Sequence, residues 1–202
     1  IPDSIILQLP DLSEKYQINT VLRMAHFLSQ CSHESNNFSV VKENLNYSAN
    51  GLLSVFPKYF NENTANIFAR QPEKIANIIY ANRMGNNGNG DGWKHRGFGF
   101  LQITGKSNQD AFVEWVGDPK IKETPELIAT NYPLLSAVYF FTVNNILPVC
   151  DQGSNKIIIT KVTKMVNGGT IGLISRIEKF NQIYKLLVWK ILGANDRVFL
   201  NK

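Results

Sequence analysis

Apolar side chains recur at intervals of three and four along residues 20–32, and this spacing predicts a helix with one buried face. Thr20 stands before the first of them, where its hydroxyl can accept a hydrogen bond from the first turn. We therefore predict a core helix that begins after Thr20. The residues on its buried face are Val21, Met24, Ala25, Leu28 and Cys31.

Further helical patterns follow along the chain and predict a mainly α fold. The longest apolar stretch, residues 134–143, is too short to span a bilayer and indicates a core helix. Asn167, Gly168 and Gly169 separate the last two patterns, because asparagine and glycine favour the left-handed conformation that ends many helices. We expect helices over residues 49–56, 72–84, 107–116, 133–147, 156–166 and 172–192, with another beginning at residues 124–126.

A glycine-rich run over residues 85–92 predicts a turn, because Asn-Gly pairs tolerate positive φ. Residues 98–103 would then form one short strand of a small β-hairpin that carries Gln102 and Thr104. A phosphate-binding loop is the alternative for a glycine-rich run. The flanking segments lack the strand-helix-strand pattern that such a loop requires.

Residues 33–48 bring two carboxylates, Glu34 and Glu43, together in a segment that changes conformation between them. Glu34 would lie at the C-terminal end of the first helix, where the helix dipole and an apolar lining would favour the protonated form that a general acid needs. Glu43 follows in a polar loop, where asparagines and Tyr47 would keep it ionised as a base. Two carboxyls in such different surroundings are typical of an acid-base pair that hydrolyses sugar polymers. Two solvated surface charges are the alternative.

His33-Glu34 also occurs in the helix of zinc proteases, but that motif needs a second histidine at position 37, which is Asn37. The chain has three histidines, His26, His33 and His95, and no cysteine pair at ligand spacing. A closed zinc site therefore has too few donors. We predict no metal site and no cofactor.

Five groups of residues occur in a fixed order between positions 33 and 177. They are Glu34-Ser35 with the run Glu-Asn-Leu-Asn-Tyr-Ser-Ala at 43–49, residues 72–77 with 80–85, residues 90–93, residues 96–105 with Asn108, and residues 166–173 with Arg176-Ile177. These groups resemble family 19 of the glycoside hydrolases, in the branch that includes bacterial enzymes and phage endolysins. Five matches in order are more specific than any one of them.

The resemblance implies a lysozyme-like, mainly α fold with two lobes and a small β-hairpin beside the cleft. Residues 1–202 would form a single catalytic domain. The implied reaction is an inverting hydrolysis of β-1,4 bonds next to N-acetylated sugars. An inverting enzyme keeps its two carboxyls roughly 6.5–9.5 Å apart, which leaves room for a water molecule.

The resemblance also implies roles for individual residues. Glu34 matches the general acid, Glu43 the base that activates water, and Thr104 the hydroxyl that helps to hold this water. Arg176 matches a basic residue near the acid, for which we expect a structural ion pair, and we expect His33 to be structural there. The expected substrate-binding residues are Tyr47, Trp93, Gln102, Asn108 and Asn167.

Two positions depart from the family pattern. Phe98 stands where endolysin relatives commonly have the second arginine of Arg-Gly-Arg-Gly. The acid, base and water-holding positions are unchanged, so this departure bears on which sugars the subsites prefer and not on the reaction. His95 replaces an aromatic residue. It could titrate near neutral pH at the edge of the cleft, but we favour a hydrogen-bonding or packing role.

The chain has 202 residues and a net charge of +5, which fits one globular module. The positive charge is concentrated in residues 151–202, with nine Lys and Arg against three Asp and Glu. Such a surplus favours weak contact with anionic surfaces, such as peptide stems, phospholipid headgroups or nucleic acid. A solvated helix face explains it equally well. No nucleic-acid recognition module accompanies the lysines, so we expect no specific nucleic acid partner and a monomer.

Two cysteines, Cys31 and Cys150, are expected to be reduced and buried, with a single bridge as the alternative. Plant-type chitinases of the family usually have several disulfides. The few cysteines and the endolysin-like run at residues 43–48 therefore favour peptidoglycan glycan strands as the substrate over chitin oligosaccharides. A catalytically silent glycan-binding protein is the non-enzyme alternative.

No signal peptide is visible at the start of the chain, Ile1-Pro2-Asp3. Two sequons for asparagine glycosylation, at Asn37 and Asn46, lie where glycans would obstruct the substrate. We expect a protein made in a bacterial cytoplasm by a phage, a prophage or an effector system. It would act on the cell wall in the periplasm.

Overall fold

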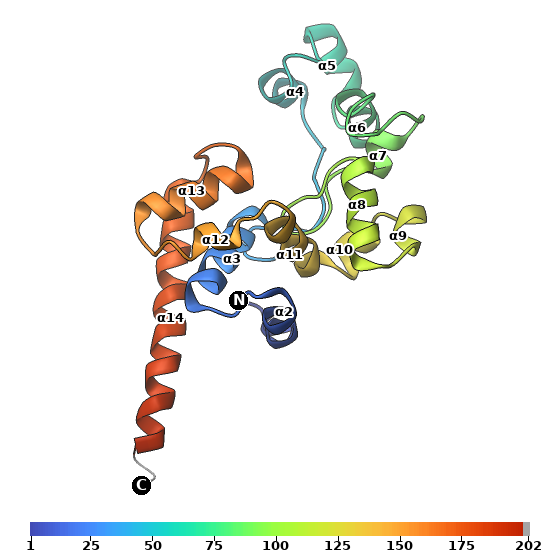
Figure 1. Cartoon of the computed structure of the whole chain (residues 1–202). Helices are drawn as coiled ribbons and strands as arrows, with labels where there is room; N and C mark the ends of the chain where they lie inside the picture. Colours follow the sequence, from blue (N-terminus) through green and yellow to red (C-terminus); the bar gives the residue numbers. More distant parts are fainter. Residues whose placement is uncertain (200–202) are drawn as a thin grey trace. The chain divides into compact units, whose positions relative to one another are not determined.

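A computed structural model describes the backbone of residues 1–199 and the side chains of residues 1–190 (Figure 1). The described residues are mainly helical, which confirms the predicted class. None of the described helices has both the length and the apolar character needed to cross a bilayer. The helices are α1 (Asp3–Ile6), α2 (Leu9–Tyr16), α3 (Val21–Glu34), α4 (Ala49–Val55), α5 (Glu62–Phe68), α6 (Pro72–Ile79), α7 (Asp91–Lys94), α8 (Lys106–Val116), α9 (Lys120–Glu123), α10 (Leu127–Thr130), α11 (Pro133–Val143), α12 (Leu147–Cys150), α13 (Lys156–Asn167) and α14 (Leu173–Phe199).

The chain divides into two compact units. The terminal unit contains Ile1–Val40 and the chain from Ala137 onward, and the central unit contains Val41–Ser136. Glu34 belongs to the terminal unit and Glu43 to the central unit. Each unit therefore presents one of the two predicted catalytic carboxyls.

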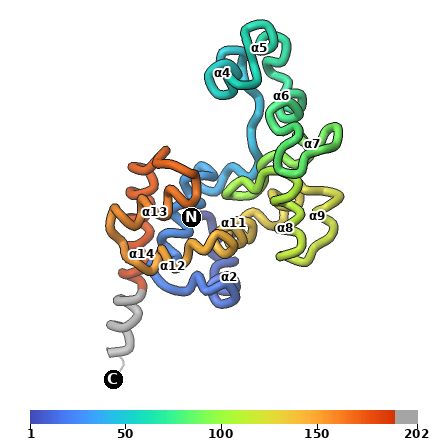
Figure 2. The backbone as a smooth tube through the Cα atoms, turned by 45° about the horizontal axis from the view of Figure 1, so that its top comes forward, coloured from blue at the N-terminus to red at the C-terminus, as the bar shows by residue number. Residues whose placement is uncertain are grey.

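The terminal unit is built around α3. Helices α12, α13 and α14 pack against it, and they lie beside it in both views of the backbone (Figures 1 and 2). Phe27 of α3 meets the edge of Phe141 at a ring distance of 5.2 Å. The Thr20 hydroxyl accepts a hydrogen bond from the Arg23 amide at 3.1 Å, which confirms the predicted N-cap. The core helix thus begins where the sequence predicts and ends at Glu34.

The central unit contains an apolar cluster formed by α4, α5, α6 and the loop before them. The hydroxyl of Ser48 caps α4 by accepting from the amide of Gly51 at 3.1 Å. Pro72 opens α6, where its missing amide hydrogen costs nothing. The buried members of the cluster are Leu45, Leu52, Phe60, Ala65, Ile75, Ala76 and Ile79.

Several helix ends differ from the prediction. Helix α6 stops at Ile79 instead of residue 84, because Asn82 and Met84 adopt left-handed conformations with φ of 56° and 52°. Helix α11 stops at Val143 instead of residue 147, and Asn145 is left-handed there. Helix α14 continues beyond the predicted end at residue 192. A left-handed residue breaks the hydrogen-bond pattern of a helix, and single-residue conformations of this kind are not visible in hydrophobic spacing.

Six short helices lie outside the predicted segments: α1, α2, α5, α7, α9 and α12. Most of them are single turns, too short to show a period of 3.6 residues. Helix α5 is an exception, because Asn61 and Thr64 form a capping box at its start. That pair is a local signal from which α5 could have been predicted.

The predicted β-hairpin is not formed. The described residues contain only isolated bridges, between Lys42 and Phe98 and between Phe98 and Ile103, and no strand. Gly99 and Gln102 have φ of 84° and 52°, so the chain folds back on itself at once instead of running extended. The turn is closed by the amide of Ile103, which donates to the carbonyl of Phe98 at 2.8 Å.

Candidate active site

Glu34 is the last residue of α3, and its side chain is 28% exposed. Its Oε1 accepts a hydrogen bond from Nη2 of Arg176, which lies on α14 and forms an ion pair with it. The Arg176 side chain is 1% exposed. A buried guanidinium therefore lies beside Glu34, in the ion pair that we expected for Arg176.

Arg176 is held by further acceptors within the terminal unit. Its Nη1 donates to Oε1 of Gln30, and its Nε donates to the carbonyl of Ile171 at 3.3 Å. Gln30 in turn donates to the hydroxyl of Thr163 on α13 at 3.2 Å. This chain of contacts joins α3, α13 and α14 behind Glu34 and fixes the direction from which the cation approaches the carboxyl.

His33 lies beside Glu34 on the same helix. Its Nδ1 is hydrogen-bonded to the hydroxyl of Ser175 at 3.0 Å, and burial, together with the charge of Arg176, lowers the pKa of the imidazole. The ring fills the space above Gly172, where an added Cβ would come within 2.2 Å of Nε2. His33 therefore packs α3 against the start of α14.

Asn167 ends α13 and stabilises the turn that leads to α14. Its side-chain amide donates to the carbonyl of Ile171 at 3.0 Å, and its side-chain oxygen accepts from the amide of Gly169 at 2.8 Å. Ile171 also accepts from Arg176, so the turn and the ion pair of Glu34 share one carbonyl.

Glu43 has a different environment in the central unit. Its Oε1 accepts from the hydroxyl of Tyr80 at 2.6 Å, and its Oε2 accepts from the amide of Gly97 at 3.1 Å. Burial and the hydrogen bond to Glu43 raise the pKa of Tyr80, so its hydroxyl remains a donor. Both donors to the carboxylate are neutral.

Tyr80 is a functional candidate that the analysis of the sequence did not single out. We expected asparagines and Tyr47 to surround Glu43. Instead, the side chain that donates a hydrogen bond to its carboxylate is Tyr80. Proximity to Glu43 contributes to a raised pKa of Tyr47, after burial. The family-like segment 80–85 begins with Tyr80 and was the available signal.

Three predicted residues of the central unit, Glu43, Gln102 and Thr104, lie around Gly97. Its carbonyl accepts from the amide of Glu43 at 2.9 Å, so the backbones of the two residues are paired. A Cβ at Gly97 would lie 2.5 Å from Oε1 of Gln102 and 3.1 Å from Oγ1 of Thr104. A side chain at Gly97 would therefore have to displace these two groups.

Gln102 and Thr104 are held by the turn that replaces the expected hairpin. The hydroxyl of Thr104 donates to the carbonyl of Gln102 at 3.0 Å. The side-chain amide of Gln102 donates to the carbonyl of Gly99 at 2.7 Å. Oε1 of Gln102 is buried and has no hydrogen-bond partner among the described residues. An acceptor in this state can take a hydrogen bond from a ligand.

The remaining predicted residues of the central unit take different positions. Asn108 is exposed on α8 and donates to the carbonyl of Thr104 at 2.7 Å. Tyr47 and Trp93 pack against the apolar cluster, and the guanidinium of Arg96 lies over the Trp93 ring at 3.7 Å. Both aromatic rings are therefore partly used in packing.

The two departures from the family pattern are buried. Phe98 belongs to the core, and the guanidinium of Arg96 lies 4.8 Å from its ring. Nδ1 of His95 is hydrogen-bonded to Gln109 at 2.7 Å, and burial lowers the pKa of the ring. These contacts fit the packing role that we favoured for His95.

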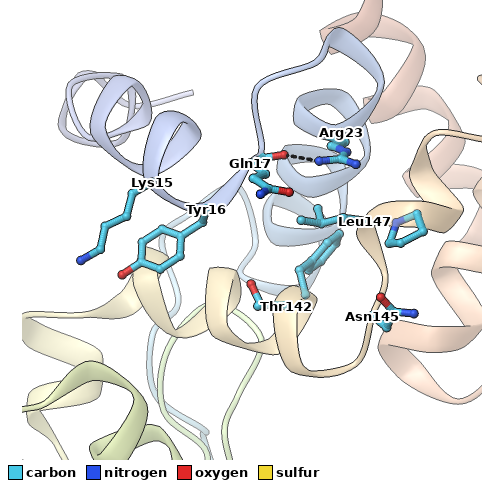
Figure 3. A pocket seen from close by; sticks show the side chains of 9 residues that line it. Lys15, Tyr16, Gln17, Arg23, Thr142, Asn145 and Leu147 are labelled. Carbon is cyan, nitrogen blue, oxygen red and sulfur yellow. Dashed lines mark hydrogen bonds between the residues drawn. The ribbon is translucent and has the colours of Figure 1, made fainter.

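A separate hollow of 320 Å³ lies at the other end of α3, in the terminal unit (Figure 3). Lys15 and Tyr16 line it from the end of α2, and Arg23 lines it from α3. Arg23 and Glu34 are eleven residues apart on one helix, which corresponds to about 16 Å. Arg23 already forms two hydrogen bonds with Asp151, so its charge is compensated. The hollow is distinct from the surroundings of Glu34.

The described residues contain no group of three or more His, Cys, Asp and Glu side chains that could hold a metal ion. Cys31 and Cys150 are free and buried. Burial raises the pKa of both thiols, that of Cys150 to about 12. The prediction of reduced, buried cysteines is confirmed.

A comparison with models of protein families found no match. A search of curated proteins found a glycosyl hydrolase family 19 domain-containing protein from Haemophilus influenzae, to which the chain is 42% identical over 167 residues. The matched region covers 80% of this chain and 78% of the other protein. On this similarity, the chain belongs to glycosyl hydrolase family 19.

Proposed function

We propose that this glycoside hydrolase cleaves the glycan strands of peptidoglycan by inverting hydrolysis of β-1,4 bonds between amino sugars. The observation that carries the proposal is the presence of two separately held carboxyls at the positions that the family resemblance assigns to acid and base. Glu34 lies beside a buried guanidinium, whereas Glu43 is held by neutral donors next to Gln102 and Thr104. Hydrolysis with inversion requires two carboxyls, one to protonate the leaving group and one to activate water. We propose a lysozyme-like arrangement of the helices.

Glu34 is the general acid in this mechanism. Arg176 contacts Oε1 of Glu34, so we assign the catalytic proton to Oε2. This proton passes to the glycosidic oxygen as the bond between that oxygen and the anomeric carbon breaks. Arg176 acts as a positioning residue, because it orients the carboxyl without contact with the reacting atoms.

Glu43 is the general base. Each of its oxygens accepts one hydrogen bond from the protein, and a carboxylate has about four acceptor positions, which leaves room for a water molecule. The hydroxyl of Thr104 uses its hydrogen toward Gln102, so its oxygen is available to accept from this water. The water oxygen attacks the anomeric carbon, its proton goes to Glu43, and the configuration is inverted.

The polar groups near Gly97 would bind the sugar. Oε1 of Gln102 is buried without a partner among the described residues, and it would accept from an acetamido N–H or a hydroxyl after the side chain turns toward the sugar. Asn108 and the aromatic rings of Tyr47 and Trp93 would extend this contact. Asn167 uses both ends of its side-chain amide within its own turn, so we assign it the placement of that turn.

Two observations support peptidoglycan over chitin. Both cysteines are free, unlike those of the disulfide-rich plant-type chitinases, and the run at residues 43–48 resembles that of endolysins. The enzyme would be made in a bacterial cytoplasm and act on the wall as a monomer. No cofactor takes part in the proposed reaction.

The test is mass spectrometry of the products from purified peptidoglycan and, in parallel, from chitin oligosaccharides. Wild type is compared with Glu34→Gln and Glu43→Gln, which keep the shape of the side chain and remove its charge. We expect muropeptides with free reducing ends from wild type. Each variant should lose about 10²–10⁴-fold in rate, the usual contribution of one acid or base.

The outcomes separate the alternatives. Chito-oligomers as the sole product would make the enzyme a chitinase, and cleavage of neither polymer would make the chain a glycan-binding protein. Anhydro-sugar ends with full activity of Glu43→Gln would indicate a lytic transglycosylase, which needs one glutamate and no base for water. A folded Glu34→Gln variant with near-normal rate would show that the acid is assigned wrongly.

A further inference from the structure

The C-terminal part of α14 exposes two large apolar side chains. Leu186 is 61% exposed and Trp189 is 69% exposed, although Ile183, one turn earlier, is buried. Residues three apart on a helix share a face, so Leu186 and Trp189 form one small apolar surface.

Lysines surround this surface. Lys185 and Lys190 are its immediate neighbours in sequence and are exposed. Neither takes part in an ion pair among the described residues. The nearest preceding lysine, Lys179, is occupied with Asn37 and Ser32. We call Lys185, Leu186, Trp189 and Lys190 the basic apolar patch.

This composition matches an anionic lipid surface better than other partners. Tryptophan prefers the boundary between headgroups and acyl chains, and lysine can keep its ammonium at the phosphates while its alkyl stem lies along apolar surface. A second copy of the chain would bring lysines of like charge together. Among the described residues, it would also bury only two apolar side chains from each copy, well short of the roughly 1,200 Å² of a stable interface.

We propose that the basic apolar patch binds the surface of an anionic phospholipid bilayer. Leu186 and Trp189 enter the headgroup region, and Lys185 and Lys190 contact the phosphates. Two apolar side chains and two cations give weak, reversible binding that salt reduces. The proposal does not depend on the glycan chemistry, because no residue of the patch is assigned a role in cleavage.

The test is sedimentation of the full chain with vesicles of phosphatidylglycerol and with vesicles of phosphatidylcholine, at low salt. We expect binding to phosphatidylglycerol only. Trp189→Ser should weaken it at least about tenfold, the effect of losing one large buried apolar side chain. Ile67→Ser is the matched control, because Ile67 is 62% exposed on α5 and lies outside the patch.

The charged part is tested separately. Replacement of both Lys185 and Lys190 by Ser should weaken binding by about 25-fold, at about fivefold for each lysine near the surface. Replacement of Lys74 and Lys120, both exposed in the central unit, removes the same charge and should leave most of the binding intact. Circular dichroism verifies that all variants are folded.

Several results would overturn the proposal. Wild type could fail to bind phosphatidylglycerol vesicles, or Trp189→Ser could bind them as well as wild type does. Dimers that form without lipid and disappear in Trp189→Ser, with no vesicle binding, would assign the patch to a second copy. Tighter binding to a single-stranded oligonucleotide than to vesicles would assign it to nucleic acid.

Discussion

The carboxyl of Glu34 is held by a cation in the terminal unit, whereas the carboxyl of Glu43 is held by neutral donors in the central unit. Arg176 is almost fully buried and reaches Glu34 from a network of side chains on three helices. Tyr80 and the amide of Gly97 reach Glu43 from a loop and a turn.

The difference between a charged and a neutral partner has different consequences for the stability of the fold and for the rate of the reaction. A buried cation that loses its partners destabilises the fold, because its desolvation is no longer compensated. Neutral donors can be removed at a smaller cost. We therefore expect changes to the partner of Glu34 to affect folding most, and changes to the partners of Glu43 to affect the rate.

The largest effect should come from Arg176→Ala. This change leaves a cavity and removes the donor to Gln30 and to Glu34, and we expect a loss of about 2–5 kcal/mol in the free energy of unfolding, as for other large buried side chains replaced by alanine. Chemical denaturation followed by circular dichroism measures it. Arg23→Ala is the control, since it breaks a more exposed ion pair and should cost about 1 kcal/mol or less. Equal losses in both variants would remove the distinction between the two carboxyls.

Gly97→Ala should change the rate more than the stability. The added Cβ would push against the ends of the Gln102 and Thr104 side chains, which can move, so the fold should survive. Displacement of groups around the attacking water should lower kcat about 10²-fold. Gly169→Ala is the control, because nothing lies within 4 Å of a Cβ at that position. Normal turnover in Gly97→Ala would contradict the assignment of the water site.

Tyr80→Phe should have a smaller effect. It removes the hydroxyl that donates to Glu43 at 2.6 Å and preserves the packing of the ring. One hydrogen bond to a charged group corresponds to about a tenfold loss in rate. The matched control is Tyr59→Phe, which removes a hydroxyl that accepts from Arg83 away from Glu43. A steady-state assay with both variants is sufficient, and indistinguishable rates would show that Tyr80 does not position the base.

The smallest effect should be a dependence of stability on pH. In the folded chain, burial and the charge of Arg176 lower the pKa of His33, whereas an unfolded histidine titrates near its ordinary value of about 6.5. Below that value the unfolded chain binds more protons, so stability falls as pH decreases. His26 and His95 act in the same direction. Denaturation curves at neutral and mildly acidic pH should show a shallower slope for His33→Gln, and an unchanged slope would contradict this account.

Local features of the molecule were predictable from the sequence. Thr20 caps its helix as predicted, and α13 ends where Gly168 takes the left-handed conformation. The free cysteines and the mainly helical class also follow from composition and spacing. Each of these depends on interactions between residues within about one turn of each other, which the sequence specifies directly.

The identities of Glu34 and Glu43 as candidates came from sequence, but their partners did not. Tyr80 is 37 residues from Glu43, and Arg176 is 142 residues from Glu34. The small β-hairpin was wrong because two left-handed residues fold the chain back between Phe98 and Ile103. The sequence by itself determined most of the longer helices and the two candidate carboxyls. The tertiary structure decided that one carboxyl meets a cation and the other neutral donors, because contacts between distant residues depend on how whole helices pack.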